Sequence, residues 1–284
     1  MITLPSPAKL NLFLHITGRR ADGYHNLQTV FQLLDYGDEL SFMPTTQAEL
    51  RLTCNDPLLQ SDNNLVVKAA HKLQDLSKTD VGCHIHLHKR LPIGGGLGGG
   101  SSNAATTLLA LNQLWQCGLT LNELMPLGLQ LGADVPLFLF GHSSWAEGIG
   151  EKLVKMTLPE QWFVVISPPC QVATAEIFKH MQLTRNSAPI RIPAFPFSGT
   201  KNDCEPVACL LNPLIKTALN WLGNFSEPHM SGTGSSVFAR FNSRAQAMEV
   251  MTHIPSGFSG FVAQGINSSP LHASLYQRMA VEQH

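Results

Sequence analysis

The 284-residue sequence lacks several features that define whole classes of protein. It has no run of about 18 apolar residues, so it predicts no membrane-spanning helix, and its first residues lack the basic start of a signal peptide. None of the six cysteines forms a CxxC pair, which disfavours a zinc knuckle or a disulfide framework and favours a reducing, cytoplasmic setting. The formal net charge is −1, so no overall field draws the chain to nucleic acid or to a membrane.

Charged residues are also scarce, at 14%, whereas hydrophobic residues make up 44% of the chain. This balance is typical of a packed globule rather than of a disordered chain. The length is sufficient for two hydrophobic cores. Expected strands and helices alternate loosely, with hairpin-like pairs near the start, so we expect an α+β fold with two domains, residues 1–150 and 151–284.

The expected elements follow from hydrophobic spacing and from turn residues. We expect residues 2–16 to form two strands separated by a turn at Pro5 and Pro7, and residues 194–204 to form an irregular connector. Other expected strands cover 27–42, 83–91, 161–169, 258–266 and the end of 229–241. Expected helices cover 62–76, 101–116, 119–132, 174–181, 211–223 and 244–254. Asp62 or Asn63 would cap the first helix, and Ala104, Leu108, Leu111 and Trp115 would form the buried stripe of the second.

The stretch LPIGGGLGGGSSNAA (91–105) holds six glycines in seven positions. It is not a Walker loop, because no lysine follows either possible glycine pair, Gly94 with Gly99 or Gly95 with Gly100. Gly94, Gly96 and Gly99 fit a dinucleotide fingerprint, but a second helix follows where that fold needs a strand and an acidic residue. A turn needs one or two glycines rather than six. The run therefore favours a backbone that closely approaches an anion.

A helix that begins near Ser101 would present unpaired N–H groups and the positive end of its dipole to such an anion. The upstream glycines would let further amides surround it, and the hydroxyls of Ser101 and Ser102 would add donors. Together these features predict a phosphate site at a helix N-terminus.

Five stretches, in this order, resemble the motifs of the GHMP kinases: PAKLNLFL (7–14), GRRADGYH (18–25), the glycine run, GADVPLFL (132–139) and SGTGSS (231–236). The resemblance implies a two-domain GHMP-kinase-like fold with the active site in the cleft between the domains. It also implies a monomeric or homodimeric kinase that uses ATP and Mg²⁺. Within the family, the GYH stretch points to a base-containing acceptor, cytidine diphosphate methylerythritol. Phosphorylation of its 2-hydroxyl is a step in the non-mevalonate route to isoprenoid precursors.

Two other readings remain. One is a different small-molecule kinase of this family, similar to mevalonate kinase or homoserine kinase. The other is a non-catalytic nucleotide-binding regulator on the same fold, which the presence of both Lys9 and Asp134 disfavours.

The resemblance implies that Asp134 is the general base and that Lys9 pairs with it. From the residues alone, Asp134 is a helix cap, since Pro136 follows in a first-turn position. Lys9 alone in an apolar strand would reach towards solvent unless it were paired. Asn11, two residues further along the strand, lies on the same face as Lys9. It could bind substrate or be a satisfied polar group of the strand.

The remaining substrate contacts are also implied by the resemblance. Tyr24 and His25 would hold the cytidine, with Phe178 on the other side of the stack, although a phenylalanine in TAEIFKHM is more often part of a core. Thr174 would contact the substrate. The segment Gly232, Thr233 and Gly234 would shape a loop near the transferred phosphate, or would simply form a tight turn.

A larger set of residues is expected to bind ATP. All of them belong to the glycine run, flank it, or are expected near the adenine and ribose. These are Asn64, Lys89, Pro92, Gly94, Gly95, Gly96, Leu97, Gly98, Gly99, Gly100, Ser101 and Ser102. No acidic residue follows the glycine run to bind Mg²⁺, and Glu123 lies in another helix. Ser101, Ser102 and the phosphates themselves would then hold an ion that keeps most of its waters.

His84, His86 and His88 alternate along one expected strand, so they share a face. Histidines at this spacing could bind a metal. A solvated polar face of the sheet explains them equally well, because no carboxylate cluster accompanies them. We therefore expect no protein-bound metal there.

Overall fold

A computed structural model describes residues 1–192, 197 and 199–281. Within these residues, ten strands join in one sheet with the order β3-β4-β2-β10-β7-β9-β8; β1 pairs with β2, and β5 pairs with β2 and β6. Neighbouring strands are antiparallel except for the parallel pair β3–β4. The strands are β1 (Ile2–Arg19), β2 (His25–Thr45), β3 (Leu50–Cys54), β4 (Gly82–His88), β5 (Ser144–Glu147), β6 (Lys152–Lys155), β7 (Trp162–Ser167), β8 (Pro228–Met230), β9 (Val237–Phe241) and β10 (Ser259–Ile266).

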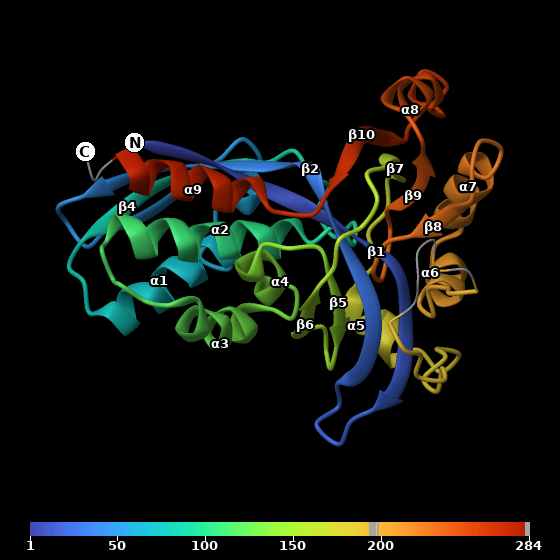
Figure 1. Cartoon of the computed structure of the whole chain (residues 1–284), viewed down its shortest axis with the longest axis horizontal. Helices are drawn as coiled ribbons and strands as arrows, with labels where there is room; N and C mark the ends of the chain where they lie inside the picture. Colours follow the sequence, from blue (N-terminus) through green and yellow to red (C-terminus); the bar gives the residue numbers. More distant parts are fainter. Residues whose placement is uncertain (193–196, 198, 282–284) are drawn as a thin grey trace.

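The long strands β1 and β2 form a ribbon that starts near the chain termini, runs to the middle of the molecule and bends there past β5 and α5 (Figure 1). Their pairing is interrupted by bulges between Pro7 and Lys9, between Asn11 and Leu14, and between Ile16 and Gly18. At these points, backbone groups of β1 turn to other partners. The two-strand prediction for residues 2–16 is therefore wrong, because the chain passes through both prolines as one strand.

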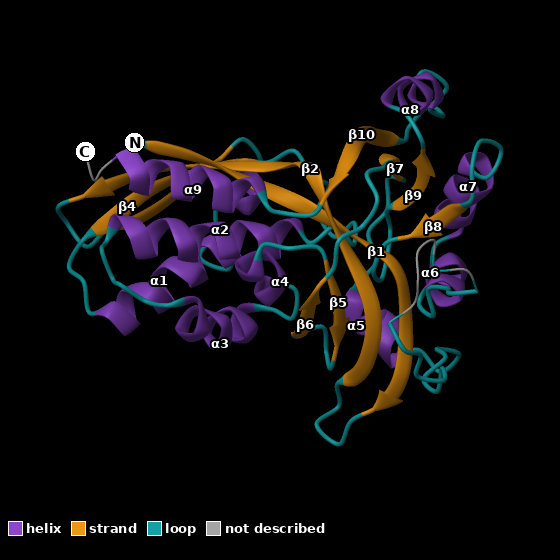
Figure 2. Ribbon diagram, in the orientation of Figure 1, coloured by secondary structure: helices purple, strands orange, loops and turns teal. Residues whose placement is uncertain are grey.

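Helices cover the two ends of the sheet separately (Figure 2). One group comprises α1 (Leu65–Ser77), α2 (Gly99–Leu114), α3 (Leu121–Leu131) and α4 (Val135–Phe140), packed around α2. The other comprises α5 (Thr174–Lys179), α6 (Glu205–Leu211), α7 (Pro213–Leu222) and α8 (Arg244–Met251). The last helix, α9 (Pro270–Val281), returns to pack against β1 beside the first group (Figure 1). A boundary at residue 150 stays a prediction, since the last helix of the second half lies on the first half.

Buried side chains form a core under each helical group and a third core along the ribbon. The predicted stripe of α2, namely Ala104, Leu108, Leu111 and Trp115, is buried as expected. Among the helices of the described part of the chain, none is both long and apolar enough to cross a membrane.

Several boundaries differ from the sequence-based expectations. Helix α1 begins at Leu65 and is capped by Asn64, whose side chain accepts from Val66 N, rather than by Asp62 or Asn63. Helix α2 begins at Gly99, inside the glycine run, rather than at Ser101. The sequence patterns did not predict β3, the β5–β6 hairpin, α4, α6 or α9. Part of the expected connector 194–204, namely residues 194–196 and 198, lies outside the described residues.

Candidate active site

A cavity of about 1140 Å³ lies where the ribbon, the glycine run and the start of α5 meet. It brings together most of the predicted site residues. These are Lys9, Asn11, Tyr24, His25, Asn64, Lys89, Pro92, Gly94, Gly95, Gly96, Leu97, Gly98, Gly99, Gly100, Ser101, Asp134, Thr174, Phe178, Gly232 and Thr233. Two predicted residues, Ser102 and Gly234, do not line it.

The glycine run is held against the free edge of β1. Lys9, which follows the bulge between Pro7 and Lys9, donates its N–H to Leu97 O at 3.0 Å. Ser231 bridges the same edge to the second small-residue loop: its Oγ accepts from Asn11 N and donates to Gly96 O. The two loops therefore meet on one strand, so the side chains of that strand lie between them.

Glycine is required at particular positions of the run. Gly96 has φ +73°, and a Cβ there would lie 2.1 Å from Ser231 O. Gly98 has φ +71°, and a Cβ there would lie 2.8 Å from the Phe138 ring and 3.0 Å from the stem of Lys9. Both positions combine a left-handed backbone with a close approach that only glycine permits.

The N-terminus of α2 faces the cavity without a side-chain cap. Its N-cap is Gly98, which has no side chain, and the first turn contains no acidic residue. The helical ladder starts with Ser102 N, which donates to Gly98 O at 2.8 Å. The amides of Gly99, Gly100 and Ser101 therefore precede the ladder and, with the helix dipole, can bind an anion in the cavity.

Lys9 and Asp134 form an ion pair at the wall of the cavity. Lys9 Nζ lies 3.3 Å from Asp134 Oδ2 and also donates to Asn11 Oδ1. The Lys9 side chain is 3% exposed and that of Asp134 is 32% exposed, so the carboxylate is open to a ligand while its cation is buried. Asp134 occupies the N-cap position of α4 but makes no capping hydrogen bond. The capping role that the residues alone favoured is therefore not the one that its side chain takes.

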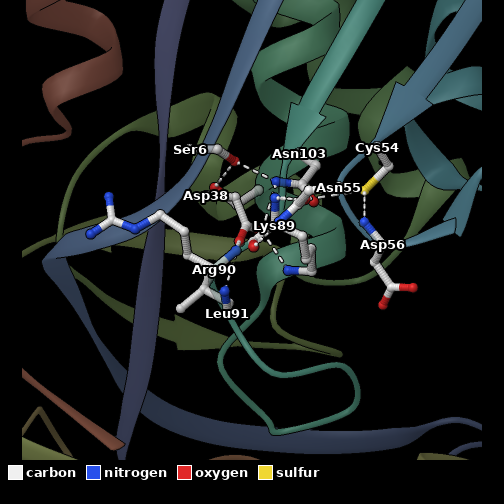
Figure 3. A network of polar contacts seen from close by, with 10 residues as sticks. Ser6, Asp38, Cys54, Asn55, Asp56, Lys89, Arg90, Leu91 and Asn103 are labelled. Atoms are coloured by element: carbon white, nitrogen blue, oxygen red, sulfur yellow. Dashed lines mark hydrogen bonds and ion pairs between the residues drawn. The ribbon is translucent and has the colours of Figure 1, made fainter. Parts of the chain in front are cut away.

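A buried carboxylate that the sequence-based reasoning missed fixes the entrance to the glycine run (Figure 3). Asp38, on β2, accepts from Arg90 N and Leu91 N at 2.8 Å each, from Asn103 Nδ2 at 3.0 Å and from Lys89 Nζ. Lys89, predicted as a nucleotide contact, is thus held by an ion pair at the edge of the cavity. The available signal was weak, because Asp38 stands between Asp35 and Glu39 in the same stretch of β2.

Ser102 belongs to the same network rather than to the cavity. It is fully buried, and its hydroxyl accepts from Ser6 Oγ at 2.9 Å. Asn103 Nδ2 donates to Ser6 Oγ at the same distance. Ser101 lines the cavity instead, so only one of the two predicted hydroxyl donors is in position.

The far end of the cavity is aromatic. His25 and Phe178 stack directly, with ring centroids 5.1 Å apart and an interplanar angle of 24°. They therefore do not enclose a gap between them, as the expected stack would need. Tyr24 is 58% exposed and lies at the mouth of the cavity. Thr174 and Thr233 share a hydrogen bond of 3.0 Å between their hydroxyls, which joins α5 to the second loop.

The remaining candidate metal groups lie elsewhere. Glu123 accepts from Thr120 N in a capping box at the start of α3. His84, His86 and His88 alternate with the buried residues of β4, and His86 and His88 are exposed. Among the described residues, no group of three or more His, Cys, Asp or Glu side chains is placed to hold a metal ion.

Known proteins resemble the chain over nearly its whole length. Residues 64–142 match the family described as GHMP kinases N terminal domain. The 4-diphosphocytidyl-2-C-methyl-D-erythritol kinase of Marinobacter nauticus is 52% identical over 279 residues, with 96% of this chain and 97% of the relative covered. The enzyme of the same name from Pseudomonas fluorescens is 52% identical over 274 residues, with 96% and 97% covered.

Solved structures show the same likeness. The crystal structure of a 4-(cytidine 5'-diphospho)-2C-methyl-D-erythritol kinase superposes with a TM-score of 0.81 at 30% identity, over 94% of this chain and 100% of that chain. A mevalonate kinase superposes with a TM-score of 0.67 at 15% identity, over 94% and 100%. At that identity the second likeness shows a shared fold alone.

Proposed function

The chain belongs to the 4-diphosphocytidyl-2-C-methyl-D-erythritol kinase family of GHMP kinases, and from that premise we propose how its own residues carry the reaction. ATP binds with its phosphates at the glycine run and the start of α2. The 2-hydroxyl of 4-diphosphocytidyl-2-C-methyl-D-erythritol lies against Asp134. The scattered cysteines, all of them free, support a reducing cytoplasm as its location. We infer a monomer or a homodimer.

The observation that carries this assignment is the arrangement of Lys9 and Asp134 beside an uncapped helix terminus in one cavity. A phosphate on the amides of Gly99, Gly100 and Ser101 would lie on the same side of β1 as the carboxylate. Lys9 joins the two parts, since its N–H holds the glycine run while its side chain holds Asp134.

In the proposed step, Asp134 accepts the proton of the 2-hydroxyl. The hydroxyl oxygen forms a bond to the γ-phosphorus in line, while the bond from that phosphorus to the β–γ bridging oxygen breaks and ADP leaves. Lys9 holds the Asp134 carboxylate in place and offsets negative charge that develops on the nucleophile. The alcohol is tertiary, so positioning carries much of the barrier reduction, about 7–11 kcal/mol.

Mg²⁺ fits this site as an ion carried mainly by the triphosphate. Asp134 and the Ser101 hydroxyl are oxygen donors that line the cavity. The other acidic side chain in the lining, Asp22, is engaged by Arg20 in a two-pronged ion pair. When bound, Mg²⁺ would neutralise charge on the phosphate oxygens and keep several of its waters.

Replacement of Asp134 by asparagine tests the proposal. We expect kcat with ATP and the cytidine substrate to fall at least about a hundredfold, because the amide cannot accept the proton. ATP binding, measured by calorimetry, should be retained. The matched control is Asp75→Asn, at an exposed position of α1 outside the cavity.

Wild-type turnover by Asp134→Asn would contradict the assignment of the base. Assay of mevalonate and homoserine beside the cytidine substrate tests the acceptor, and preference for either would contradict the proposed substrate. Absence of turnover with all three acceptors would contradict the kinase assignment as a whole.

A further inference from the structure

Arg185 lies beside His25 at the aromatic end of the cavity and lines it. Its Nε donates to His25 Nε2 at 3.2 Å. Its Nη1 donates to Leu183 O, and its Nη2 donates to Phe178 O and to His180 O, at 2.8–3.2 Å. The guanidinium therefore joins His25 to the end of α5 and to the segment that follows it.

The hydrogen bond from Arg185 Nε to His25 Nε2 determines the tautomer of the imidazole. Arginine has only donors, so His25 Nε2 must accept with a free lone pair. The proton of a neutral imidazole then resides on Nδ1. Stacking on Phe178 holds the plane of the ring, and a 180° flip within that plane would lose the hydrogen bond from Arg185, because a ring carbon would replace Nε2.

Burial and nearby positive charges also favour the neutral form of the His25 ring. Burial lowers the pKa of His25, and the positive charges of Arg185 and of Arg19, its pairing partner on β1, lower it further. Among the described residues, Arg185 makes no ion pair with a carboxylate that would cancel this effect. The imidazole therefore stays neutral at neutral pH.

We propose that Arg185 is a positioning residue that holds His25 as the neutral Nδ1–H form, so that the ring offers a hydrogen-bond donor to the pyrimidine of the acceptor. The proposal rests on the proposed function, which brings a cytidine diphosphate to this end of the cavity. Within the described part of the chain, no protein group accepts a hydrogen bond from His25 Nδ1, so that donor is left for a ligand.

A donor at this position discriminates between pyrimidines. N3 of cytosine is an acceptor, whereas N3 of uracil carries a hydrogen, so only cytosine can accept from Nδ1–H through that atom. Uracil would leave two donors facing each other, and an unpaired buried donor is costly. Arg185 thus determines base specificity through His25 without itself needing to touch the base.

Two measurements test this inference. The first is the imidazole ¹⁵N spectrum of the wild-type protein without ligand, in which we expect His25 to be neutral at pH 7 with the proton on Nδ1. The second is the binding of CDP and UDP by calorimetry. We expect wild type to prefer CDP, and Arg185→Met to reduce that preference by roughly threefold to tenfold, the value of one hydrogen bond. The spectrum of Arg185→Met should show a higher pKa for His25 and a proton on Nε2.

The control is Arg191→Met, the same substitution at an exposed arginine of the same segment that does not line the cavity. It should leave the spectrum and the CDP preference unchanged. A purely structural role for Arg185 would weaken CDP and UDP equally, and that result would overturn the inference.

A wild-type proton on Nε2 would also overturn it, and this measurement decides the matter even if Arg185→Met fails to fold. The result is separable from the proposed function. A protein with no kinase turnover that still shows Nδ1–H and an Arg185-dependent CDP preference would contradict the kinase assignment alone.

Discussion

At the scale of single residues, Asp38 shows how a buried charge shapes the nucleotide side of the cavity. Its side chain is fully buried and accepts four hydrogen bonds, three from residues 89–91 and one from α2. A carboxylate of this kind satisfies several donors at once, whereas its loss leaves a positive charge without a partner. Asp38 thus fixes both the backbone that enters the glycine run and the ammonium group of Lys89.

We expect Asp38→Asn to lower the free energy of unfolding by about 3–5 kcal/mol, because its NH₂ would face Lys89 Nζ and Asn103 Nδ2. The KM for ATP should rise more than the KM for the cytidine substrate. Thermal melting and steady-state kinetics measure these effects. The control is Asp35→Asn, three residues away and exposed, whose amide oxygen can still accept from Gln264 N. Equal melting temperatures for the two variants would contradict the role given to Asp38.

For Lys9, the family resemblance was the better guide. It implied a pair with Asp134, and the structure shows that ion pair, whereas the residues alone favoured a lysine that reaches towards solvent. Asp38 was missed because DYGD carries turn-forming residues, which hide a carboxylate that is satisfied by segments far along the chain. Ser102 was misplaced because Ser101 and Ser102 are equivalent in sequence, and only the rotation of α2 decides which one faces the ligand.

At the scale of elements, tertiary contacts overrode local preferences. Glycine disfavours helix, so the sequence predicted that α2 begins at Ser101. The helix instead begins at Gly99, directly after the N-cap Gly98, which lies close to Lys9 of β1 and Phe138 of α4. Pro5 and Pro7 were expected to break β1. They are tolerated because β1 pairs with β2 on one side only, so a missing N–H removes no bond from a second ladder.

Gly96 and Gly118 have nearly the same backbone conformation, so a comparison of the two separates the cost of backbone strain from the cost of a steric clash. Gly96 and Gly118 have φ of +73° and +67°, but a Cβ would strike Ser231 O at Gly96 and meet nothing within 4 Å at Gly118. We expect Gly118→Ala to cost about 1 kcal/mol of stability, from the backbone alone. Gly96→Ala should cost more than this and should weaken ATP binding as well. Denaturant unfolding and calorimetry measure the two effects, and equal losses at both positions would argue against the close contact.

At the scale of the whole molecule, partly buried histidines link stability to pH. Burial lowers the pKa of His229 and that of His272, which joins α9 to α4 through Phe138 O at 3.3 Å. Between the ordinary pKa of about 6.5 and the lower folded value, the unfolded chain binds more protons than the folded chain. The free energy of unfolding therefore falls as the pH is lowered through this window.

We expect this fall to reach up to about 1.4 kcal/mol per pH unit for each histidine. Chemical unfolding between pH 7.5 and pH 5.5 measures it. His272→Gln should reduce the slope, and the same substitution at the exposed His71 should not. Glu205, whose pKa is raised by burial, acts in the opposite direction towards the acidic end. A slope that is unchanged in His272→Gln would contradict the link.

The α+β class followed from the alternation of elements, but the order of the sheet did not. β10 pairs with β2 across more than 200 residues of chain, and α9 returns to the first half of the molecule. Neither contact has a local signature in the sequence, because each depends on surfaces that exist only after the strands have assembled. Arg185 is a similar case, since nothing near it in the sequence indicates a histidine 160 residues away.

The ribbon of β1 and β2 carries Lys9 on its middle part and His25 near its turn, so one pair of strands fixes both ends of the cavity. The distance from His25 to Lys9 and its partner Asp134 is therefore set by the fold before any ligand binds. In the proposed complex, an acceptor whose pyrimidine binds beside His25 would bring its alcohol to Asp134 only if the linker between them has the right length. The fold would thus select substrates by the length of this linker. Analogues with a shortened or lengthened diphosphate bridge should bind without reacting.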